Sequence, residues 1–234
     1  MGGGVALLVM TDGRDDYLVH CLASVAERVR GPISEWWMFD DTGDRAYRAR
    51  LADRYPRFTH INGGRRQGFG GAIRYAWERL RADSDADYVF HVEQDFTFSR
   101  EVDLSEMAEV LDEQPHLVQL ALRRQAWSAD EHAAGGVVQR HPEAYRETGD
   151  ERGRRWLEHR LFFTTNPSLY RRSLCGAGWP TGEKSEGMFS VRLCETGLPG
   201  VAPADLRFGY WGAFDSGEWV HHIGRSRARG GYGY

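Results

Sequence analysis

Lysine, cysteine and long hydrophobic runs are scarce in this chain, and the last two scarcities argue against particular classes of protein. The three cysteines are odd in number and show no CxxC spacing, which argues against a disulfide framework and a structural zinc site. Lys184 is the only lysine among 30 basic residues, an arginine bias typical of a G+C-rich genome. The net charge of −4 gives no general attraction to nucleic acid or to an anionic membrane.

The first residues lack the features of a targeting or membrane-spanning segment. Met1-Gly2-Gly3-Gly4 has no basic n-region, and Val5–Met10 is too short for a signal h-region or a membrane span. We therefore expect a cytoplasmic protein, in the host cytoplasm if the gene belongs to a phage, with no membrane partner. A length of 234 residues with 41% apolar residues favours one large domain with one substantial core.

Strand and helix patterns alternate through the first hundred residues. Short apolar runs predict strands at Val5–Met10, Trp36–Phe39, Phe58–Ile61 and Tyr88–Val92, and helical spacing predicts helices at Tyr17–Val29, Ala46–Tyr55 and Ala72–Leu80. Such alternation is typical of right-handed βαβ units. The fold class that we predict is therefore α/β, with a mostly parallel sheet flanked by helices.

The second half has a less regular pattern. It predicts a helix at Leu104–Leu111, strands at Leu117–Leu122, Leu161–Thr165 and Trp219–Ile223, a helix at Glu183–Cys194 and a long irregular loop at Arg123–Arg155. We expect residues 1–224 to form a single domain, with a nucleotide-binding half at 1–98 and a catalytic half at 99–224. Residues 225–234 form an Arg/Gly/Tyr-rich tail.

Carboxylates follow three of the predicted strands directly. Asp12 follows the first strand, Asp40-Asp41 the second, and Glu93-Gln94-Asp95 the fourth. The carboxyl ends of parallel strands meet at one edge of an open α/β sheet, where ligands usually bind. A divalent cation that bridges phosphate oxygens needs one or two carboxylates and leaves its other positions to phosphate and water. The acidic triplet is therefore a candidate metal site.

Taken in order, the motifs resemble those of a GT-A glycosyltransferase of the large inverting family 2 type. Met10–Arg14 resembles the first nucleotide-binding loop, Phe39–Gly43 the "DDGS" turn, Asn62–Ala72 the "NxG" segment, Glu93–Asp95 the DxD motif, Gly182–Gly187 the "ED" motif and His221–Gly224 the late His-Ile-Gly. The likeness covers roughly Val5–Gly224 and is weakest between Arg123 and Arg155. The sequence departs from the family pattern at two positions: Glu93 replaces the first aspartate of the DxD motif, and Gly187 replaces the aspartate of the "ED" motif after Glu186.

This resemblance implies a role for each matched residue. Asp95 would bind a divalent metal, Mn²⁺ or Mg²⁺, with His222 as a second ligand and His221 as the alternative. Glu186 would be the catalytic base, with Glu183 as the rival. The residues expected to bind the nucleotide sugar are Thr11, Asp12, Arg14, Asp40, Asp41, Arg66, Gly68, Gly70, Glu93 and Gln94. For Asp40 and Asp41 a helix N-cap is the competing interpretation.

The function implied is inverting transfer of a sugar from a nucleoside diphosphate donor, UDP-sugar foremost, to a hydroxyl acceptor. The acceptor stays open between a modified DNA base, a protein and a small molecule. Basic–aromatic patches at Arg152–Trp156, Arg171-Arg172 and Arg225–Arg229 favour DNA, whereas the net charge opposes it. The alternatives are a sugar nucleotidyltransferase and a catalytically inactive nucleotide-sugar-binding module.

Overall fold

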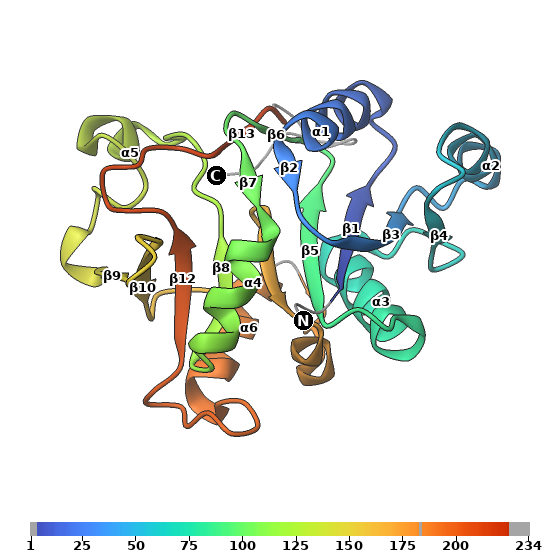
Figure 1. Ribbon diagram of the computed structural model, residues 1–234. Coiled ribbons are helices and arrows are strands. Elements are labelled where there is room, and N and C mark those ends of the chain that lie inside the picture. Colours follow the sequence, from blue (N-terminus) through green and yellow to red (C-terminus); the bar gives the residue numbers. More distant parts are fainter. Residues whose placement is uncertain (1–3, 183, 225–234) are drawn as a thin grey trace.

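The computed structural model describes residues 4–182 and 184–224, and its centre is a nine-stranded sheet. The strand order is β4-β3-β1-β5-β11-β8-β12-β10-β9 (Figure 1). Strands β4, β3, β1 and β5 are all parallel to one another, whereas β11 runs antiparallel to both of its neighbours, β5 and β8. The sheet is therefore mixed but mostly parallel, and the predicted fold class is confirmed.

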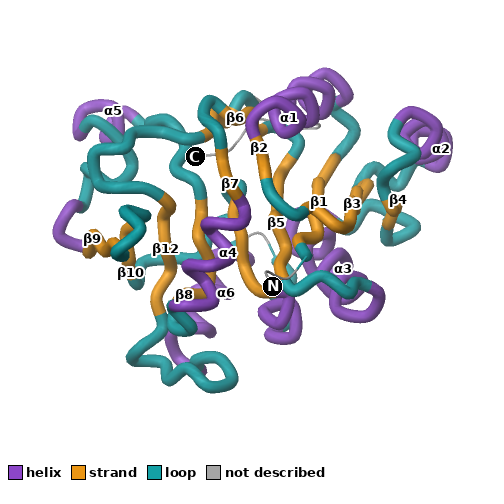
Figure 2. The backbone as a smooth tube through the Cα atoms, viewed as in Figure 1, coloured by secondary structure: helices purple, strands orange, loops and turns teal. Residues whose placement is uncertain are grey.

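The first half follows the predicted alternation of strands and helices (Figure 2). Its elements are β1 (Val5–Thr11), α1 (Asp15–Arg28), β2 (Val29–Arg30), β3 (Ile33–Asp40), α2 (Arg45–Arg54), β4 (Thr59–Ile61), α3 (Gly68–Asp83), β5 (Tyr88–Glu93) and β6 (Phe96–Phe98). The parallel register pairs Thr11 with Asp40 and Met10 with Glu93. Strands β1, β3 and β5 therefore end level with one another, as the carboxylate pattern predicts.

The second half is more irregular than the first. Its elements are β7 (Val102–Asp103), α4 (Leu104–Glu113), β8 (Leu117–Ala121), α5 (Ala129–Ala134), η1 (Pro142–Ala144), β9 (Arg146–Gly149), β10 (Arg155–His159), β11 (Ser168–Arg171), η2 (Arg172–Ala177), α6 (Ser185–Thr196), β12 (Arg207–Trp211) and β13 (Val220–His222). Strand β13 lies outside the main sheet and pairs with β6 in a two-stranded sheet. This places the late histidine strand beside the acidic triplet.

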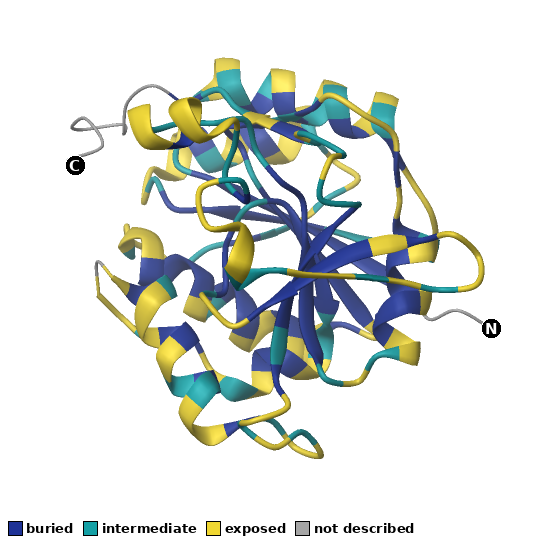
Figure 3. Ribbon diagram, turned by 90° about the vertical axis from the view of Figure 1, so that its left-hand side faces the viewer, coloured by how far each residue is buried: buried dark blue, intermediate teal, exposed yellow. Residues whose placement is uncertain are grey.

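Alternate side chains of the central strands feed two cores, one on each face of the sheet. Leu7 of β1 and Phe90 of β5 belong to the core that includes residues of α1, α2 and α4. Leu8 and Val89 belong to the other core, with residues of α3, η2 and α6. Figure 3 shows the buried strands between helices whose outer faces are exposed. No helix in the described ranges is long and apolar enough to cross a membrane.

The predicted loop at Arg123–Arg155 is wrong in part, because the segment contains α5, η1 and β9. Helix α5 begins with a capping box, in which the hydroxyl of Ser128 accepts from the backbone N–H of Glu131 and the Glu131 carboxylate accepts from that of Ser128. Arg124 also pairs with Glu131, at 2.8 Å. This paired, capped turn orders a segment whose composition is that of a loop.

The predicted strand at Leu161–Thr165 is also wrong. The N–H of Phe163 donates to Ser190 Oγ at 2.7 Å, and the N–H of Thr165 donates to Glu186 Oε1 at 2.7 Å. These two backbone groups are therefore satisfied by side chains of α6 rather than by a neighbouring strand. The true strands β10 and β11 lie on either side of this segment.

Candidate active site at the carboxyl edge of the sheet

The carboxyl ends of β1, β3 and β5 carry a network of polar side chains. Thr11 Oγ1 donates to Gln94 Oε1 at 2.6 Å, and Gln94 Nε2 donates to Asp12 Oδ1. The backbone N–H of Gln94 also donates to Met10 O at 3.0 Å, which prolongs the ladder between β1 and β5. Strand β5 itself ends at Glu93, so Gln94 and Asp95 lie in a turn, where side chains no longer alternate between the two faces of the sheet. The sheet edge thereby brings Thr11, Asp12 and Gln94 together.

Asp95 lies at the centre of the charged groups of this edge. Its side chain is 2% exposed, and Oδ2 lies 3.0 Å from Arg14 Nη2 and 3.4 Å from His222 Nε2. Arg14 Nε is also 2.8 Å from Asp12 Oδ1. The predicted metal residues Asp95 and His222 are thus in contact, although 127 positions separate them in the chain.

His222 is held from several sides. The Gln125 side chain accepts from the backbone N–H of His222 at 2.9 Å and donates to its carbonyl at 3.0 Å. The imidazole ring also contacts the rings of Phe96 and Trp127, with centroids 4.8 and 4.7 Å away. This clamp fixes the imidazole beside Asp95. The neighbouring His221 is exposed and lies 3.9 Å from Glu218, so the structure brings His222 rather than the alternative His221 to the site.

Gly224 allows the His222 segment to approach Asp95. The backbone N–H of Ile223 donates to Asp95 O at 2.8 Å. A Cβ atom at position 224 would lie 2.4 Å from Asp95 Oδ2, closer than any real contact. A side chain at this position would therefore force the Asp95 carboxylate or the backbone of this segment to shift.

The two aspartates that follow β3 have different surroundings. Asp40 accepts from the N–H of Thr42 at 2.9 Å, and its Oδ2 lies 3.5 Å from Arg48 Nε. Asp41 accepts from the N–H groups of Gln67 and Gly68, at 2.6 and 3.0 Å. Asp41 therefore caps the N-terminus of α3 from a distant position in the chain. The N-cap residues of α2 and α3 themselves are Asp44 and Gln67, so neither Asp40 nor Asp41 takes the N-cap position that the sequence left open. Burial raises the pKa of Asp41, and these N–H groups partly oppose the rise.

The remaining predicted donor-site residues lie around the start of α3. The N–H of Gly68 is already directed at Asp41, so it forms part of the cap. A Cβ atom on Gly70 would lie 3.1 Å from the carbonyl oxygens of Pro180 and Gly182, so this glycine permits close packing against the loop before α6. Arg66 is exposed and lowers the pKa of Asp41 through its charge.

Glu186 reaches the same edge from α6. Its Oε1 accepts from both the N–H and the Oγ1 of Thr165, at 2.7 and 2.9 Å. Burial raises its pKa, and the two bonds from Thr165 partly oppose the rise. Burial also raises the pKa of Glu93 well above its usual value, and the negative charges of Asp95 and Glu186 add to the increase. The base candidate therefore lies close enough to Glu93 for their charges to interact, while Glu183 falls outside the described residues.

Several site residues carry no signal in the sequence. Thr165 lies in an irregular segment, and Gln125 lies in the segment expected to be a loop. Each acts through one polar side chain on a residue that is distant in sequence: Gln125 on His222, and Thr165 on Glu186. Only the folded chain identifies such partners.

The arginine patches take part in internal pairs. Arg154 contacts Asp150 at 2.5 Å and Glu113 at 2.9 Å, and its side chain is 5% exposed. Arg152 pairs with Glu109, and Arg155 pairs with Glu147. The charge of this patch is therefore compensated by neighbouring carboxylates. The tail patch, Arg225–Arg229, lies outside the described residues.

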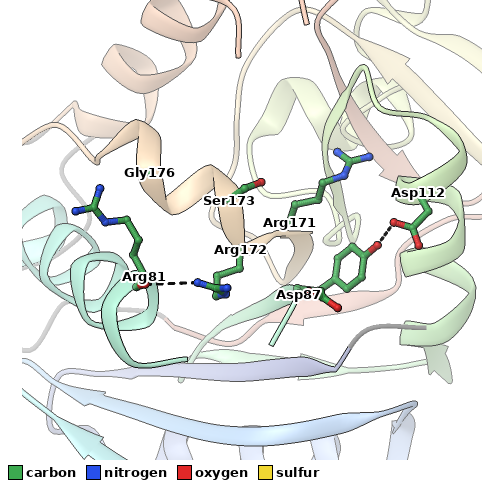
Figure 4. A pocket seen from close by; sticks show the side chains of 8 residues that line it. Arg81, Asp87, Asp112, Arg171, Arg172, Ser173 and Gly176 are labelled. Atoms are coloured by element: carbon green, nitrogen blue, oxygen red, sulfur yellow. Dashed lines mark hydrogen bonds between the residues drawn. The ribbon is translucent and has the colours of Figure 1, made fainter. Parts of the chain in front are cut away.

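A hollow of about 620 Å³ lies at the other end of β5, away from the acidic triplet (Figure 4). Arg171 and Arg172 line it, but Arg171 donates to the carbonyl of Leu117 at 2.9 Å and Arg172 to that of Ala86 at 2.5 Å. The hydroxyl of Tyr88 donates to Asp112. These hydrogen bonds join helix ends and strands, which gives the polar groups named here a structural role.

The residues at that edge fit a divalent ion. Asp95 Oδ2 and His222 Nε2 are 3.4 Å apart, close to the spacing of neighbouring ligands that each lie about 2.1 Å from one ion. Among the described residues, no three His, Cys, Asp or Glu side chains gather into a metal centre by themselves. With one carboxylate and one imidazole as ligands, the remaining coordination positions of the ion would be open to phosphate and water, as in sites where the substrate completes the coordination.

Comparison with known families gives one match by sequence. The sequence model described as "Glycosyl transferase family 2" matches residues 7–179, nearly three quarters of the chain. A search of curated proteins finds no match. The matched range contains most of β1, all of β3 and β5, and the acidic triplet, and it ends before Glu186 and His222.

Solved structures share the fold. The mannosyltransferase PcManGT from Pyrobaculum calidifontis, in complex with GDP-Man and Mn²⁺, aligns with a TM-score of 0.54 at 14% identity, covering 89% of this chain and 57% of its own. GalNAc-T7 with UDP, GalNAc and Mn²⁺ aligns with a TM-score of 0.62 at 10% identity, and the alignment covers 95% of this chain and 44% of GalNAc-T7. S. aureus TarS 1-349 in complex with UDP-GlcNAc aligns with a TM-score of 0.59 at 16% identity, and the alignment covers 96% of this chain and 59% of the TarS chain. This chain thus spans about half the length of each.

Proposed function

The chain belongs to glycosyl transferase family 2, and from this membership we propose that it is a metal-dependent inverting glycosyltransferase. Its donor would be a nucleoside diphosphate sugar and its acceptor a hydroxyl group. One observation carries the proposal. Asp95 in contact with His222, and Glu186 held by Thr165, lie at the same sheet edge, where they would supply a cation site and a general base together.

The donor diphosphate needs positive charge when it leaves. Asp95 and His222 would hold a divalent ion, and the bound ion would neutralise the diphosphate. Thr11, Asp12 and Gln94 form the polar network beside it, and Asp40 lies level with Thr11 on the next strand. We propose that these residues bind the nucleoside, with UDP as the preferred nucleotide. The solved complexes of similar fold contain either UDP or GDP in free or sugar-linked form, so the nucleotide is part of the test.

The acceptor hydroxyl needs a base. Glu186 would take its proton while the oxygen attacks the anomeric carbon from the face opposite the leaving diphosphate, which inverts the configuration. The two bonds from Thr165 hold one carboxylate oxygen in place and leave the other for the acceptor. The raised pKa makes the ionised Glu186 a stronger base than a solvent-exposed glutamate.

The acceptor class follows from charge. The arginines at 152, 154 and 155 already pair with carboxylates, and the net charge is −4. This pairing disfavours recognition of a DNA phosphate backbone by that patch. We therefore propose a protein or small-molecule hydroxyl as the acceptor, ahead of a modified DNA base. Residues 1–98 would serve the donor, and residues 99–224 would serve the acceptor and the base.

A panel of UDP- and GDP-sugars tests the proposal. With Mn²⁺ present, the correct donor should raise the melting temperature, because a ligand at 100 times its Kd adds about 2.7 kcal/mol of stability. The same donor should be slowly hydrolysed, and EDTA should abolish the hydrolysis. Stabilisation without hydrolysis would instead indicate an inactive binding module. Release of pyrophosphate from a nucleoside triphosphate and a sugar phosphate would indicate a nucleotidyltransferase.

A further inference from the structure

Arg14 occupies an unusual position for a residue next to a cation site. Its guanidinium joins two carboxylates, with Nε 2.8 Å from Asp12 Oδ1 and Nη2 3.0 Å from Asp95 Oδ2. That same Asp95 oxygen faces His222. The oxygen best placed to bind a metal ion is therefore already in contact with a positive charge.

A divalent ion and this guanidinium would repel each other. An ion bound to Asp95 Oδ2 would lie about 2.1 Å from the oxygen, and Arg14 Nη2 lies 3.0 Å from it. The Asp95 side chain is 2% exposed and that of Arg14 is 17% exposed, so little water is present to screen the two charges. Binding of the ion therefore favours movement of the arginine away from Asp95.

The position of Arg14 in the backbone keeps its side chain near this edge of the sheet. Arg14 follows Gly13, which has a φ of 101°, and it is the N-cap residue of α1. It therefore lies on the turn between β1 and a 14-residue helix whose N-terminus faces the carboxyl edge of the sheet. A donor diphosphate held by the ion would lie at this edge, within the region that the long side chain can reach.

We propose that Arg14 stands in for the divalent ion in the metal-free protein and is exchanged for it. In the metal-free state its guanidinium neutralises Asp12 and Asp95. When the ion binds Asp95, the guanidinium is released to the diphosphate of the donor. This inference rests on the metal site of the proposed function, and it makes Arg14 a competitor of the metal and a partner of the nucleotide.

The two roles predict opposite effects of one substitution. Arg14→Gln removes the competing charge, so calorimetric titration with Mn²⁺ alone should show affinity on the order of tenfold tighter than that of the unmodified protein, equal to about 1.4 kcal/mol. Titration of UDP at saturating Mn²⁺ should show the reverse, with affinity on the order of tenfold weaker. Arg14→Met provides a second neutral variant, and Arg28→Gln on the outer part of α1 controls for loss of one positive charge.

The outcomes separate the parts of the account. Unchanged or weaker Mn²⁺ affinity in both neutral variants overturns the exchange, and so does an equal gain in Arg28→Gln. Tighter Mn²⁺ binding with unchanged UDP affinity overturns the release to the diphosphate. Asp95→Asn distinguishes the inference from the proposed function: if that variant still binds Mn²⁺ as well as the unmodified protein, the metal site itself is wrong.

Discussion

The two parts that we propose as the donor half, residues 1–98, and the acceptor half, residues 99–224, contribute to the same sheet edge by different routes. In the donor half, Thr11, Asp40 and Glu93 end adjacent parallel strands, so the strand register alone brings them level. In the acceptor half, Glu186 comes from a helix and His222 from a short strand outside the main sheet. Side chains from distant positions help to hold them: Thr165 holds Glu186, and Gln125 holds the backbone of His222.

The comparison shows that regular secondary structure positions some of these side chains, whereas individual contacts position the others. Backbone ladders position the donor-side carboxylates, and the ladders continue past the strand ends through the N–H groups of Asp41 and Gln94. No ladder of the main sheet reaches His222 or Glu186. Substitutions of the strand-end residues in the donor half should therefore act on the ligand directly, whereas substitutions of supporting residues such as Gln125 in the acceptor half should act by moving another side chain.

The largest effect is expected at Asp95. Asp95→Asn keeps the size of the side chain but removes the charge that would hold the ion, so transfer should fall by at least about 10³-fold, since metal catalysis supplies several kcal/mol. Rates of sugar transfer at saturating Mn²⁺ and donor measure this, with circular dichroism to show that the fold persists. Asp130→Asn, in an exposed pair with Arg140, is the matched control. Near-normal transfer by Asp95→Asn would remove the metal assignment.

The next effect tests positioning in the acceptor half. Gln125→Ala removes both hydrogen bonds that hold the backbone of His222. Mn²⁺ affinity should fall by about 10- to 100-fold, the usual cost of losing an outer-shell partner. Calorimetric titration measures the change. Gln139→Ala, which removes a single bond to Phe214 O in the same half, should leave the affinity unchanged. Unchanged Mn²⁺ affinity in Gln125→Ala would mean that other contacts, such as those with the rings of Phe96 and Trp127, are enough to hold the imidazole.

A smaller effect concerns stability at low pH. Burial lowers the pKa of His159 from 6.5 to about 3, and its Nδ1 accepts from the N–H of Leu161. The unfolded chain takes up the proton first, so stability should fall as the pH drops from about 6.5 towards 3, by about 1.4 kcal/mol per pH unit from this group.

His159→Phe keeps a ring but removes this titration. Urea unfolding at several pH values should show a shallower loss of stability for this variant than for the unmodified protein. His141→Gln, an exposed histidine, should not change the slope. Equal slopes for His159→Phe and the unmodified protein would contradict a neutral, buried imidazole.

The smallest expected effect is on DNA. Because the arginines at 152, 154 and 155 are paired, replacing all three with glutamine should leave any weak binding to duplex DNA, and its dependence on salt, nearly unchanged. Three phosphate contacts would instead contribute about −2.7 to the log–log salt slope. A gel shift at several salt concentrations decides between them. A slope that flattens by two to three units would restore DNA as the acceptor.

The sequence predicts the donor half well because its signals are local. Apolar runs that end at Asp12, Asp40 and Glu93 identify both the strands and the edge where they meet. The errors fall in the acceptor half, where side chains replace regular pairing. Ser190 and Glu186 bind the backbone of the segment predicted to be a strand, and the Ser128 capping box orders the segment predicted to be a loop. A pattern of residue types cannot specify such contacts between distant positions.

The most direct test of the account separates binding in the donor half from chemistry in the acceptor half. Glu186→Gln keeps the bonds from Thr165 possible but cannot accept the acceptor proton. We predict donor affinity within about twofold of normal and transfer slower by about 10²–10⁴-fold. Glu195→Gln, exposed on the same helix, should be normal in both. Weakened donor binding with preserved turnover in Glu186→Gln would contradict the account.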